Sequence, residues 1–272
     1  MTIPTRSVGD LLRDWRQRRR MSQLELATEA QISTRHLSFV ETGRSLPSRD
    51  MLLRLAEQLQ VPLRDRNTLL NAAGFASVFP EREFADPSLE AVRKAVDKVL
   101  AAHLPYPAFA VDRHWTLVAS NGGFRPFVSG IDPQLLQPPI NVLRLTLHPG
   151  GLGPRLANHQ QWRSHVLEGL RQQIKVSGDP ILIALLVELK EYPAPREINS
   201  NPASSGAEEW HRMVVPFQLA TKMGVLSFYT TTTIFGTPVD ITLSELSMEL
   251  FYPADAATAE AFKETSADRT SA

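Results

Sequence analysis

The sequence predicts a two-domain protein in which an all-α domain of five short helices precedes an α+β domain with an antiparallel sheet. The chain has 272 residues, which is near the upper limit for a single hydrophobic core. Residues 8–73 show apolar positions at helical spacing without strand-like alternation, and strand-like runs appear only after residue 107. The two segments therefore belong to different structural classes.

The first domain is expected to contain five helices, because start and stop signals divide it into short segments. Ser22 and Ser33 stand where the N-caps of the second and third helices belong, and Glu25 completes a capping box with Ser22. Gly43 follows the third helix, where a left-handed residue is favoured, and Pro62 opens the fifth. The apolar residues expected to face the core are Val8, Leu11, Leu12, Trp15, Leu24, Leu26, Ala27, Leu37, Val40, Met51, Leu52, Leu55, Leu59, Leu69, Leu70 and Ala73.

The net charge of the whole chain is zero, but the charge is divided between the two domains. Residues 1–75 contain twelve arginines, no lysine and eight acidic residues, a net charge of +4, and residues 76–272 carry −4. A basic domain ahead of an acidic body is expected when only the first must meet a polyanion such as nucleic acid. A basic face that is merely solvated is the alternative interpretation.

Composition excludes several other classes of protein. The chain has no cysteine, which rules out disulfide scaffolds, cysteine-ligated zinc fingers, iron–sulfur clusters and thiol catalysis. The longest apolar runs, such as residues 181–187, are far shorter than a membrane helix requires, and the N-terminus has no apolar secretory core. We therefore expect a soluble, cytoplasmic protein.

A boundary between the domains is expected at residues 76–87, which mix charge with two prolines and have no hydrophobic period. A helix with an apolar stripe is expected over residues 89–100, where it would connect the domains or pack in a dimer. The expected organisation is a helical domain at 1–75, a linker and connecting helix at 76–106, a second domain at 107–255 and a polar tail at 256–272.

In the second domain the sequence predicts both strands and helices. Residues 109–121 predict a hairpin of two short strands around Asp112-Arg113. Helices are expected over residues 156–176 and 181–192, the second after the start signal Gly178-Asp179-Pro180. The expected antiparallel strands lie at residues 213–219, 225–235 and 241–251, with a bulge or break between Leu243 and Leu246, where the apolar phase shifts.

The most specific pattern is a pair of short helices around a turn at Gln31-Ile32, which is typical of a helix-turn-helix. The residues that carry it are Ser22, Gln23, Leu26, Ala27, Glu41, Thr42, Gly43, Arg44, Pro47, Leu52, Leu55 and Ala56. On these residues the first domain resembles the lambda-repressor-like (Xre/Cro) family. The resemblance implies a DNA-binding transcription regulator whose second motif helix lies in the major groove.

The same resemblance implies roles for individual residues. Thr34, Arg35 and Phe39 fall at positions that meet base edges, where arginine suits guanine and phenylalanine can pack on a thymine methyl. The positions where the family places phosphate contacts are held by Gln23, Ser33 and Arg44. Phe39 departs from the polar residue often found there, which leaves the base preference open.

Each assignment also has a purely structural interpretation. Ser33 can act only as a helix cap, Gln23 as a surface residue and Phe39 as part of the core. The run Arg18-Arg19-Arg20 either flanks phosphates or forms a solvated helix end that complements the helix dipole.

One pair of charged residues is expected to be structural. Arg16 and Glu41 match positions that form a buried ion pair in some members of the family. We therefore expect an ion pair there with little direct functional role.

Further segments point to the nature of the second domain. They are AVDRHWTLVASN at 110–121, NVLRLTLHP at 141–149, ILIALLVELKEYP at 181–193, Trp210, and MELFYPAD at 248–255. On these segments, residues 107–253 resemble the MmyB-like ligand-binding domain, a PAS-like module. The resemblance implies a curved antiparallel sheet with helices on one face and a small-molecule site between them.

Side chains expected between the strands and the helices are candidates for that site. They are Trp115, Phe124, Phe127, Leu143, Trp162, Val166, Leu186, Trp210, Phe217 and Phe228. Plain core packing is the alternative for each of them. Such a lining predicts a lipophilic, fatty-acid-like effector with an acyl chain, and Arg144, Arg155 or Arg163 is available for a polar head group.

The sequence contains no recognisable arrangement of catalytic residues, and neither a metal nor a cofactor is expected. Its seven histidines form no HxH or HExxH arrangement, and neither GxSxG nor GxGxxG occurs. We therefore expect a homodimeric regulator, not an enzyme, that binds operator DNA and is tuned by a small molecule. Two alternatives stay open: an enzymatic second domain, and a second domain that serves only dimerisation or partner binding without a ligand.

Overall fold

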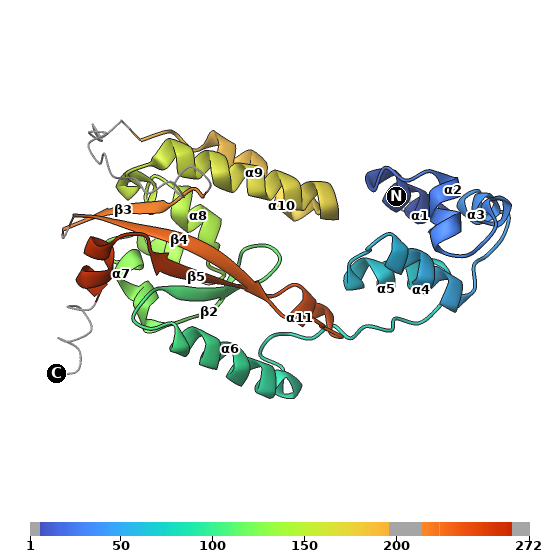
Figure 1. Cartoon of the computed structure of the whole chain (residues 1–272), viewed down its shortest axis with the longest axis horizontal. Coiled ribbons are helices and arrows are strands. Elements are labelled where there is room, and N and C mark those ends of the chain that lie inside the picture. Colours follow the sequence, from blue (N-terminus) through green and yellow to red (C-terminus); the bar gives the residue numbers. More distant parts are fainter. Residues whose placement is uncertain (1–5, 196–213, 223, 263–272) are drawn as a thin grey trace. The chain divides into compact units, whose positions relative to one another are not determined.

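The computed structural model describes residues 6–195, 214–222 and 224–262, and the chain divides into two compact units (Figure 1). The first unit runs to Arg82 and includes residues 175–177 and 237–244, and the second contains the remainder. The first is helical and the second holds an antiparallel sheet, so the predicted two-domain fold class is confirmed. None of the helices in the described ranges combines the length and apolarity that a membrane span requires.

The predicted helices of the first unit are present, with sharp turns between them. They are α1 (Val8–Arg18), α2 (Gln23–Glu29), α3 (Thr34–Glu41), α4 (Arg49–Gln58) and α5 (Leu63–Ala72). The predicted caps are confirmed, because the Ser22 hydroxyl accepts the Glu25 N–H (3.1 Å) and the Ser33 hydroxyl accepts the His36 N–H (3.1 Å). The left-handed residues that follow these helices are Arg20, Gln31, Gly43, Gln60 and Gly74. This conformation reverses the chain within one or two residues and keeps the helices close.

The apolar faces of these helices meet in one core, with one exception to the prediction. Leu24 was expected to face inward but is 65% exposed. The inward face of α2 is formed by Leu26, Ala27 and Ala30, all buried. Leu24 lies about 110° around the helix from the centre of that face, so it cannot reach the core.

Arg16 and Glu41 form the predicted ion pair, which joins α1 to α3. The Arg16 Nε donates to Glu41 Oε1 (2.6 Å) and its Nη2 donates to Oε2 (2.8 Å). The two side chains are 11% and 2% exposed. The hydrogen bond from Arg16 to the carboxylate raises the pKa of Arg16 above its ordinary value. Both charges are therefore compensated inside the protein.

The sheet of the second unit has the strand order β2-β1-β5-β4-β3, with every neighbouring pair antiparallel. The strands are β1 (Ala108–Val111), β2 (Leu117–Ser120), β3 (Phe217–Thr221), β4 (Gly224–Ile234) and β5 (Ser247–Pro253). The predicted hairpin and the predicted run of three antiparallel strands are confirmed. The last strand was predicted to start at residue 241, but Ile241–Ser244 forms a short helix, α11. Asp240 begins this helix by accepting the Thr242 N–H (2.9 Å), so the predicted break is a change from helix to strand.

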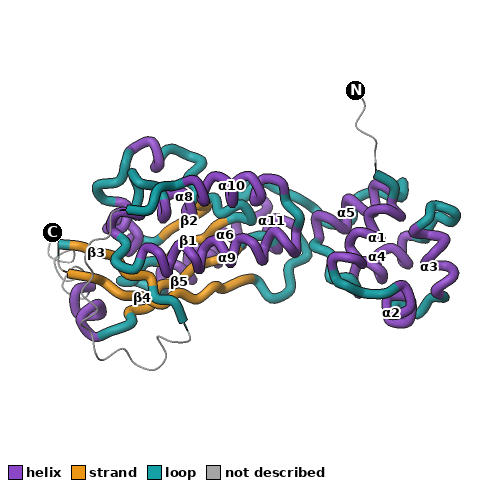
Figure 2. Tube along the Cα trace, turned by 90° about the horizontal axis from the view of Figure 1, so that it is seen from above, coloured by secondary structure: helices purple, strands orange, loops and turns teal. Residues whose placement is uncertain are grey.

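Both faces of this sheet are covered by helices (Figures 1 and 2). On one face lies α6 (Glu90–Ala102), whose Val96 and Leu100 pack with Ala110 and Met248 of the sheet. The other face carries α7 (Arg125–Val128), α8 (Val142–Leu147), α9 (His159–Ser177) and α10 (Pro180–Glu191), with the larger aromatic core. The helices α7–α10 lie on one face, as the resemblance implied, and α6, which was expected as a connecting helix, covers the other face with its apolar stripe.

The chain continues to contribute to this unit after β5. Residues 256–262 were expected in a polar tail, but they are helical, and Thr258 and Phe262 are buried. The Thr258 hydroxyl accepts the Ser227 N–H (2.9 Å), and the ring of Phe262 contacts that of Phe228 (centroids 5.5 Å apart). This segment therefore closes one end of the aromatic core.

Replacing Glu41 by alanine is expected to lower the free energy of unfolding of the first unit by about 3 kcal/mol, because Arg16 would stay buried without its partner. Urea unfolding followed by far-ultraviolet circular dichroism measures the change. Glu57→Ala, which removes an exposed carboxylate from α4, is the control and should cost less than about 0.5 kcal/mol. Equal losses in both variants would mean that the ion pair does not stabilise the unit.

Candidate functional site

The helix-turn-helix is formed by α2, a tight turn and α3. Gln31 in the turn is left-handed (φ 55°), and the Ile32 N–H donates to the Ala27 carbonyl (2.9 Å). Leu37 and Val40 of α3 are fully buried against the core. These two anchors fix the rotation of α3 about its axis, and so determine which side chains it leaves outside.

The outer face of α3 carries the three residues predicted to read bases. Arg35 is exposed, while Thr34 and Phe39 are half-buried. The Arg35 guanidinium lies over the Phe39 ring, 5.4 Å from its centroid. Phe39 is not one of the core residues of this unit. The first turns of α3 thus present a planar cation and an aromatic ring where a recognition helix meets base edges.

The residues predicted to contact phosphates surround α3 but differ in their present contacts. Ser33 caps α3 with its hydroxyl, as one interpretation expected. Gln23 donates through Nε2 to Glu41 Oε2 (2.8 Å), so its amide is engaged within the protein. Arg44 is exposed after the end of α3. In the basic run, Arg19 donates to the Leu59 carbonyl (2.8 Å), which is a structural role at the end of α4.

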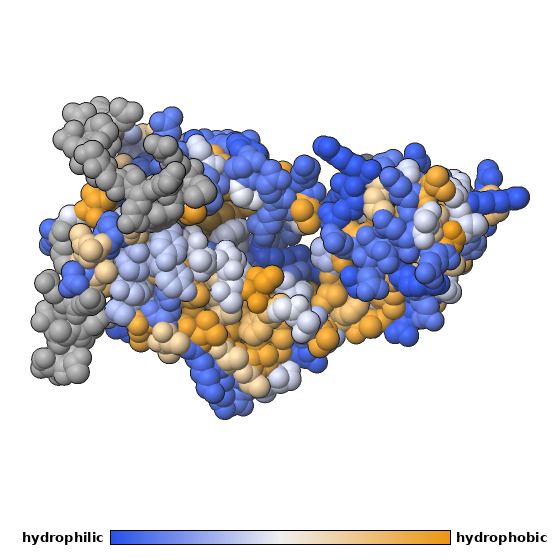
Figure 3. Space-filling view, viewed as in Figure 1, coloured by the Kyte–Doolittle hydropathy of each residue, from blue (hydrophilic) through white to orange (hydrophobic). Residues whose placement is uncertain are grey.

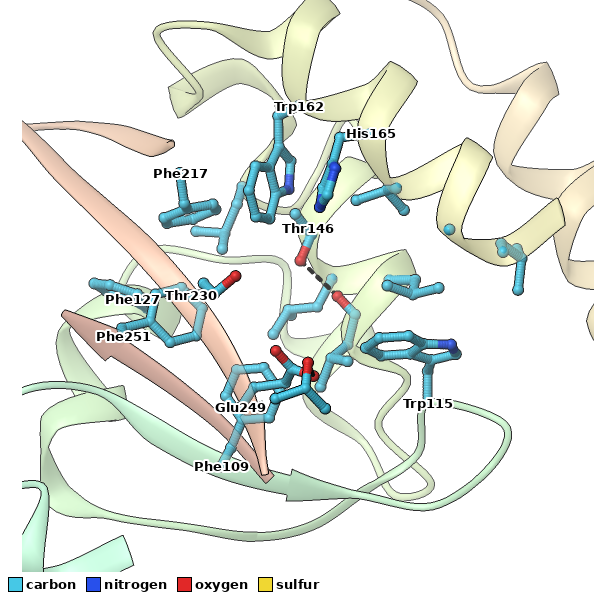
Figure 4. A pocket seen from close by; sticks show the side chains of 18 of the residues that line it. Phe109, Trp115, Phe127, Thr146, Trp162, His165, Phe217, Thr230, Glu249 and Phe251 are labelled. Carbon is cyan, nitrogen blue, oxygen red and sulfur yellow. Dashed lines mark hydrogen bonds between the residues drawn. The ribbon is translucent and has the colours of Figure 1, made fainter. Parts of the chain in front are cut away.

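A cavity of about 160 Å³ lies inside the second unit between the sheet and helices α8 and α9. Figure 4 shows aromatic side chains on several sides of it, among them Phe109 and Phe251 from the sheet and Trp162 from α9. Exposed lining residues, His165 on α9 and Thr232 on β4, mark its open side. Figure 3 shows hydrophobic side chains at the bottom of a recess beside α9.

Most of the predicted ligand-site residues converge on this cavity. Those that line it are Trp115, Phe124, Phe127, Leu143, Trp162, Val166 and Phe217. Phe228 is instead a fully buried core residue in contact with Phe127, and Leu186 packs against the same core from α10. Trp210 lies outside the described residues. Phe228 and Leu186 therefore pack in the core and do not line the cavity, which is the alternative expected for each candidate.

Sequence reasoning missed the polar residues of the cavity. They are Thr146 on α8, His165 on α9, Thr230 and Thr232 on β4 and Glu249 on β5, and the aromatic residues Phe109 and Phe251 were missed as well. Strand alternation does place Glu249 and Phe251 on one face of β5 and Met248 and Leu250 on the other. Helices cover both faces of the sheet, so both faces of β5 are mostly apolar. The alternation therefore does not tell which face lines the cavity.

Glu249 is the buried acidic group of the cavity. It is 8% exposed, and its Oε1 accepts a hydrogen bond from the Thr232 hydroxyl (2.9 Å). Burial raises the pKa of Glu249 above its ordinary value, and the hydrogen bond from Thr232 opposes part of that rise. Among the described residues that line the cavity there is no arginine or lysine. Within the part of the chain that the structure describes, the carboxyl group therefore has no guanidinium or ammonium partner in the lining.

The three arginines considered for a polar head group make contacts elsewhere. Arg144 pairs with Glu188 (Nη2–Oε2 2.7 Å) and so links α8 to α10. Arg155 donates to the Ser129 carbonyl (3.0 Å), and Arg163 donates to the Lys190 carbonyl at the end of α10 (2.7 Å). Each guanidinium thus ties the helical layer together and does not line the cavity.

Trp115 reaches the cavity wall from a strained turn. Its backbone is left-handed (φ 64°), a conformation that bulky residues rarely adopt. The indole Nε1 donates to Gln173 Oε1 of α9 (2.9 Å), and the backbone N–H donates to the Asp112 carbonyl (3.0 Å). Strain of this kind costs about 1–3 kcal/mol and tends to occur at functional sites.

Gly169 leaves space on the α9 side of the cavity. It lies in the middle of a 19-residue helix, where glycine costs about 1 kcal/mol relative to alanine. A Cβ at this position would meet no atom within 4 Å. A larger side chain therefore has room at this exposed edge of the cavity without disturbing the backbone.

A recognition helix with an outward cationic face, together with a separate domain around an apolar cavity, defines a DNA-binding regulator with a ligand-binding domain. Family models agree, because residues 12–65 match the one described as Helix-turn-helix. Residues 92–264, more than half of the chain, match the MmyB-like transcription regulator ligand binding domain. The chain belongs to this family of MmyB-like transcription regulators. No curated protein matches it closely enough to count as a relative.

Replacing Arg35 by alanine is expected to weaken binding to a preferred DNA site roughly 5- to 150-fold, because a bidentate contact with a base is worth about 1–3 kcal/mol. The site is first selected from a randomised duplex pool, and gel-shift titration then measures affinity for it and for a scrambled duplex. Arg54→Ala, which removes an exposed arginine from α4, is the matched control. If Arg35→Ala leaves the preference for the selected site unchanged, Arg35 does not read bases.

Proposed function

We propose that this regulator forms a homodimer and that α3 of each copy contacts operator DNA. We propose further that a small lipophilic ligand of acyl type in the cavity modulates this binding. The single observation that carries the proposal is the apolar cavity in a domain separate from the helix-turn-helix. A domain that served only as a platform would gain stability by filling such a space with side chains.

The DNA-binding part of the proposal rests on the outer face of α3. Arg35 and Phe39 stand on this face, with Thr34 at its start and Arg44 just after its end. One short helix contacts only a few base pairs, so a single copy would bind weakly and with little discrimination. Two copies on a palindromic site spaced by one helical turn would supply the affinity that a regulator needs.

The ligand-binding part rests on the lining of the cavity. Its aromatic and aliphatic side chains favour an apolar ligand, and the glycine at position 169 leaves open a space that only a large side chain would occupy. A volume of about 160 Å³ is close to that of an engineered cavity of about 150 Å³ that holds one benzene molecule. The ligand, or the part of it inside, therefore has on the order of six to ten non-hydrogen atoms.

The second candidate function is a domain that serves only dimerisation or partner binding. It requires no cavity, and it predicts that blocking the cavity leaves both the oligomeric state and DNA binding unchanged. The two candidates therefore differ in the effect of filling the space next to Gly169.

Native mass spectrometry of the freshly purified full chain tests the proposal. The wild type is expected to show a dimer that retains a small molecule, and Gly169→Trp is expected to keep the dimer and lose the retained mass, because the indole occupies the cavity. Gly169→Ala is the matched control, since a Cβ meets no neighbour and the helix gains about 1 kcal/mol.

The same three proteins are then compared by gel-shift titration on the selected duplex. Gly169→Trp should change the affinity for this duplex relative to Gly169→Ala if the ligand modulates binding. A dimer without any retained mass in all three proteins, and with equal DNA affinity, would favour the platform function instead.

A further inference from the structure

Trp162 on α9 carries a polar group of the cavity that has no partner. The residue lines the cavity and is only 7% exposed. Its indole Nε1 is enclosed, and no hydrogen-bond partner for this atom lies among the described residues. A buried indole N–H normally finds an acceptor, and leaving such a donor unsatisfied in the interior is unfavourable. The donor therefore favours a ligand that brings an acceptor into the cavity.

Trp115, the other indole of the described lining, shows how the chain satisfies such a donor elsewhere. Its Nε1 donates to Gln173 Oε1 on α9 (2.9 Å). The Trp162 ring is held by packing alone, since its centroid lies 5.1 Å from that of Phe217 and 5.3 Å from that of His165. The orientation of the Trp162 N–H is thus fixed by neighbouring rings and not by an internal hydrogen bond.

The other polar groups of the lining are engaged in contacts of their own. The Thr146 hydroxyl donates to the Val142 carbonyl of its own helix (2.6 Å), and Glu249 Oε1 accepts from the Thr232 hydroxyl (2.9 Å). Figure 4 shows Glu249 on the sheet side of the space, opposite Trp162 on α9. A ligand between the sheet and α9 therefore meets a free donor on the α9 side.

The lining also indicates the charge of the acceptor. Among the described residues it contains no lysine or arginine, and it contains the buried carboxyl group of Glu249. His165, which could carry a positive charge, is exposed at the open side. A carboxylate inside the cavity would lose water without a cationic partner and would share the space with a second acidic group. A neutral carbonyl oxygen accepts the same hydrogen bond at a smaller desolvation cost.

We propose that the ligand is a neutral acyl compound, such as a ketone or an ester, and that its carbonyl oxygen accepts a hydrogen bond from Trp162 Nε1. The proposal rests on the ligand-binding function proposed above and deepens it, because it names the polar group of the acyl-type ligand. Trp162 then selects a carbonyl over a hydrocarbon of the same shape. A fatty-acid carboxylate is the weaker ligand.

Two isosteric probes test this assignment on the full chain, after a hydrophobic resin has removed retained small molecules. 2-Octanone carries the carbonyl, and in 2-methyl-1-octene a methylene group replaces the oxygen. In proton–nitrogen correlation spectra, 2-octanone is expected to move the indole N–H resonance of Trp162 downfield, because this N–H gains an acceptor. The alkene is expected not to do so. The resonance is assigned by its loss in Trp162→Phe.

Two matched substitutions measure the hydrogen bond in the same titrations. Trp162→Phe keeps an aromatic ring and removes the N–H, so the ratio of the affinity for 2-octanone to that for the alkene should fall roughly two- to twelvefold, the size of one net hydrogen bond. Trp115→Phe is the control, because it removes an indole N–H whose hydrogen Gln173 already accepts. It should change the affinities for both probes by the same factor.

Three results would overturn the assignment. An unmoved Trp162 resonance with both probes bound, and an unchanged affinity ratio in Trp162→Phe, would show that this N–H meets water and not the ligand, while the site itself would stand. Octanoate that binds more tightly than 2-octanone at pH 7, and loses this advantage in His165→Gln, would identify an anionic ligand held at the open side. Binding of no probe, in a wild type that is folded by circular dichroism, would remove the proposed lipophilic site together with this inference.

Discussion

Burial of both faces of the sheet is the constraint on which the second unit depends. The face under α6 is built from small and medium side chains such as Ala108, Ala110 and Met248, which let the helix pack closely. The opposite face carries the large rings. The ring centroids of Phe217 and Phe251 are 5.5 Å apart, and those of Phe109 and Phe251 are 5.7 Å apart. Rigid rings in edge contact do not collapse into every gap, so an unfilled space can persist on this side alone.

The unfilled space has an energetic consequence. By the relation for residual cavities, about 160 Å³ corresponds to up to about 4 kcal/mol of packing that the folded chain forgoes. A ligand that only restored this packing would reach an affinity in the millimolar range, since about 4 kcal/mol corresponds to a dissociation constant of about 1 mM. Tighter and selective binding therefore requires a polar contact, and the described lining offers the buried indole N–H of Trp162 for it.

The fold was largely predictable because its signals are local. The N-caps at Ser22 and Ser33, the start signal at Gly178-Asp179-Pro180 and the phase shift after Leu243 each act within a few residues, and the structure bears them out. Which face of a helix or sheet another element covers is not determined by local sequence. Leu24 faces outward and α6 covers the second face of the sheet, because packing between distant segments decides which side of an element is buried.

The candidate sites divide in the same way. Position within the motif was enough to place Arg35 and Phe39 outside on α3, and aromatic content was enough to gather most of the cavity lining. Glu249 was missed because a charged residue in a strand normally marks the face that is exposed to solvent. Helices cover both faces of β5, so this strand has no solvent-exposed face. The arginines were considered for a polar head group because they are charged, whereas in the structure each of them contacts a neighbouring part of the helical layer.

A ligand can change DNA occupancy only if it binds two conformations of the chain unequally, and only by the difference between the two affinities. Trp115 is the point in the described structure where the cavity wall and backbone strain coincide. Strain of about 1–3 kcal/mol at this residue is comparable to what filling the cavity can supply. Since about 1.4 kcal/mol changes a population ratio tenfold, a ligand that favours one position of the Trp115 ring has enough energy to alter the balance of conformations. A cavity lined by unstrained residues could bind the same ligand. It would have no strained backbone whose relief could favour a second conformation.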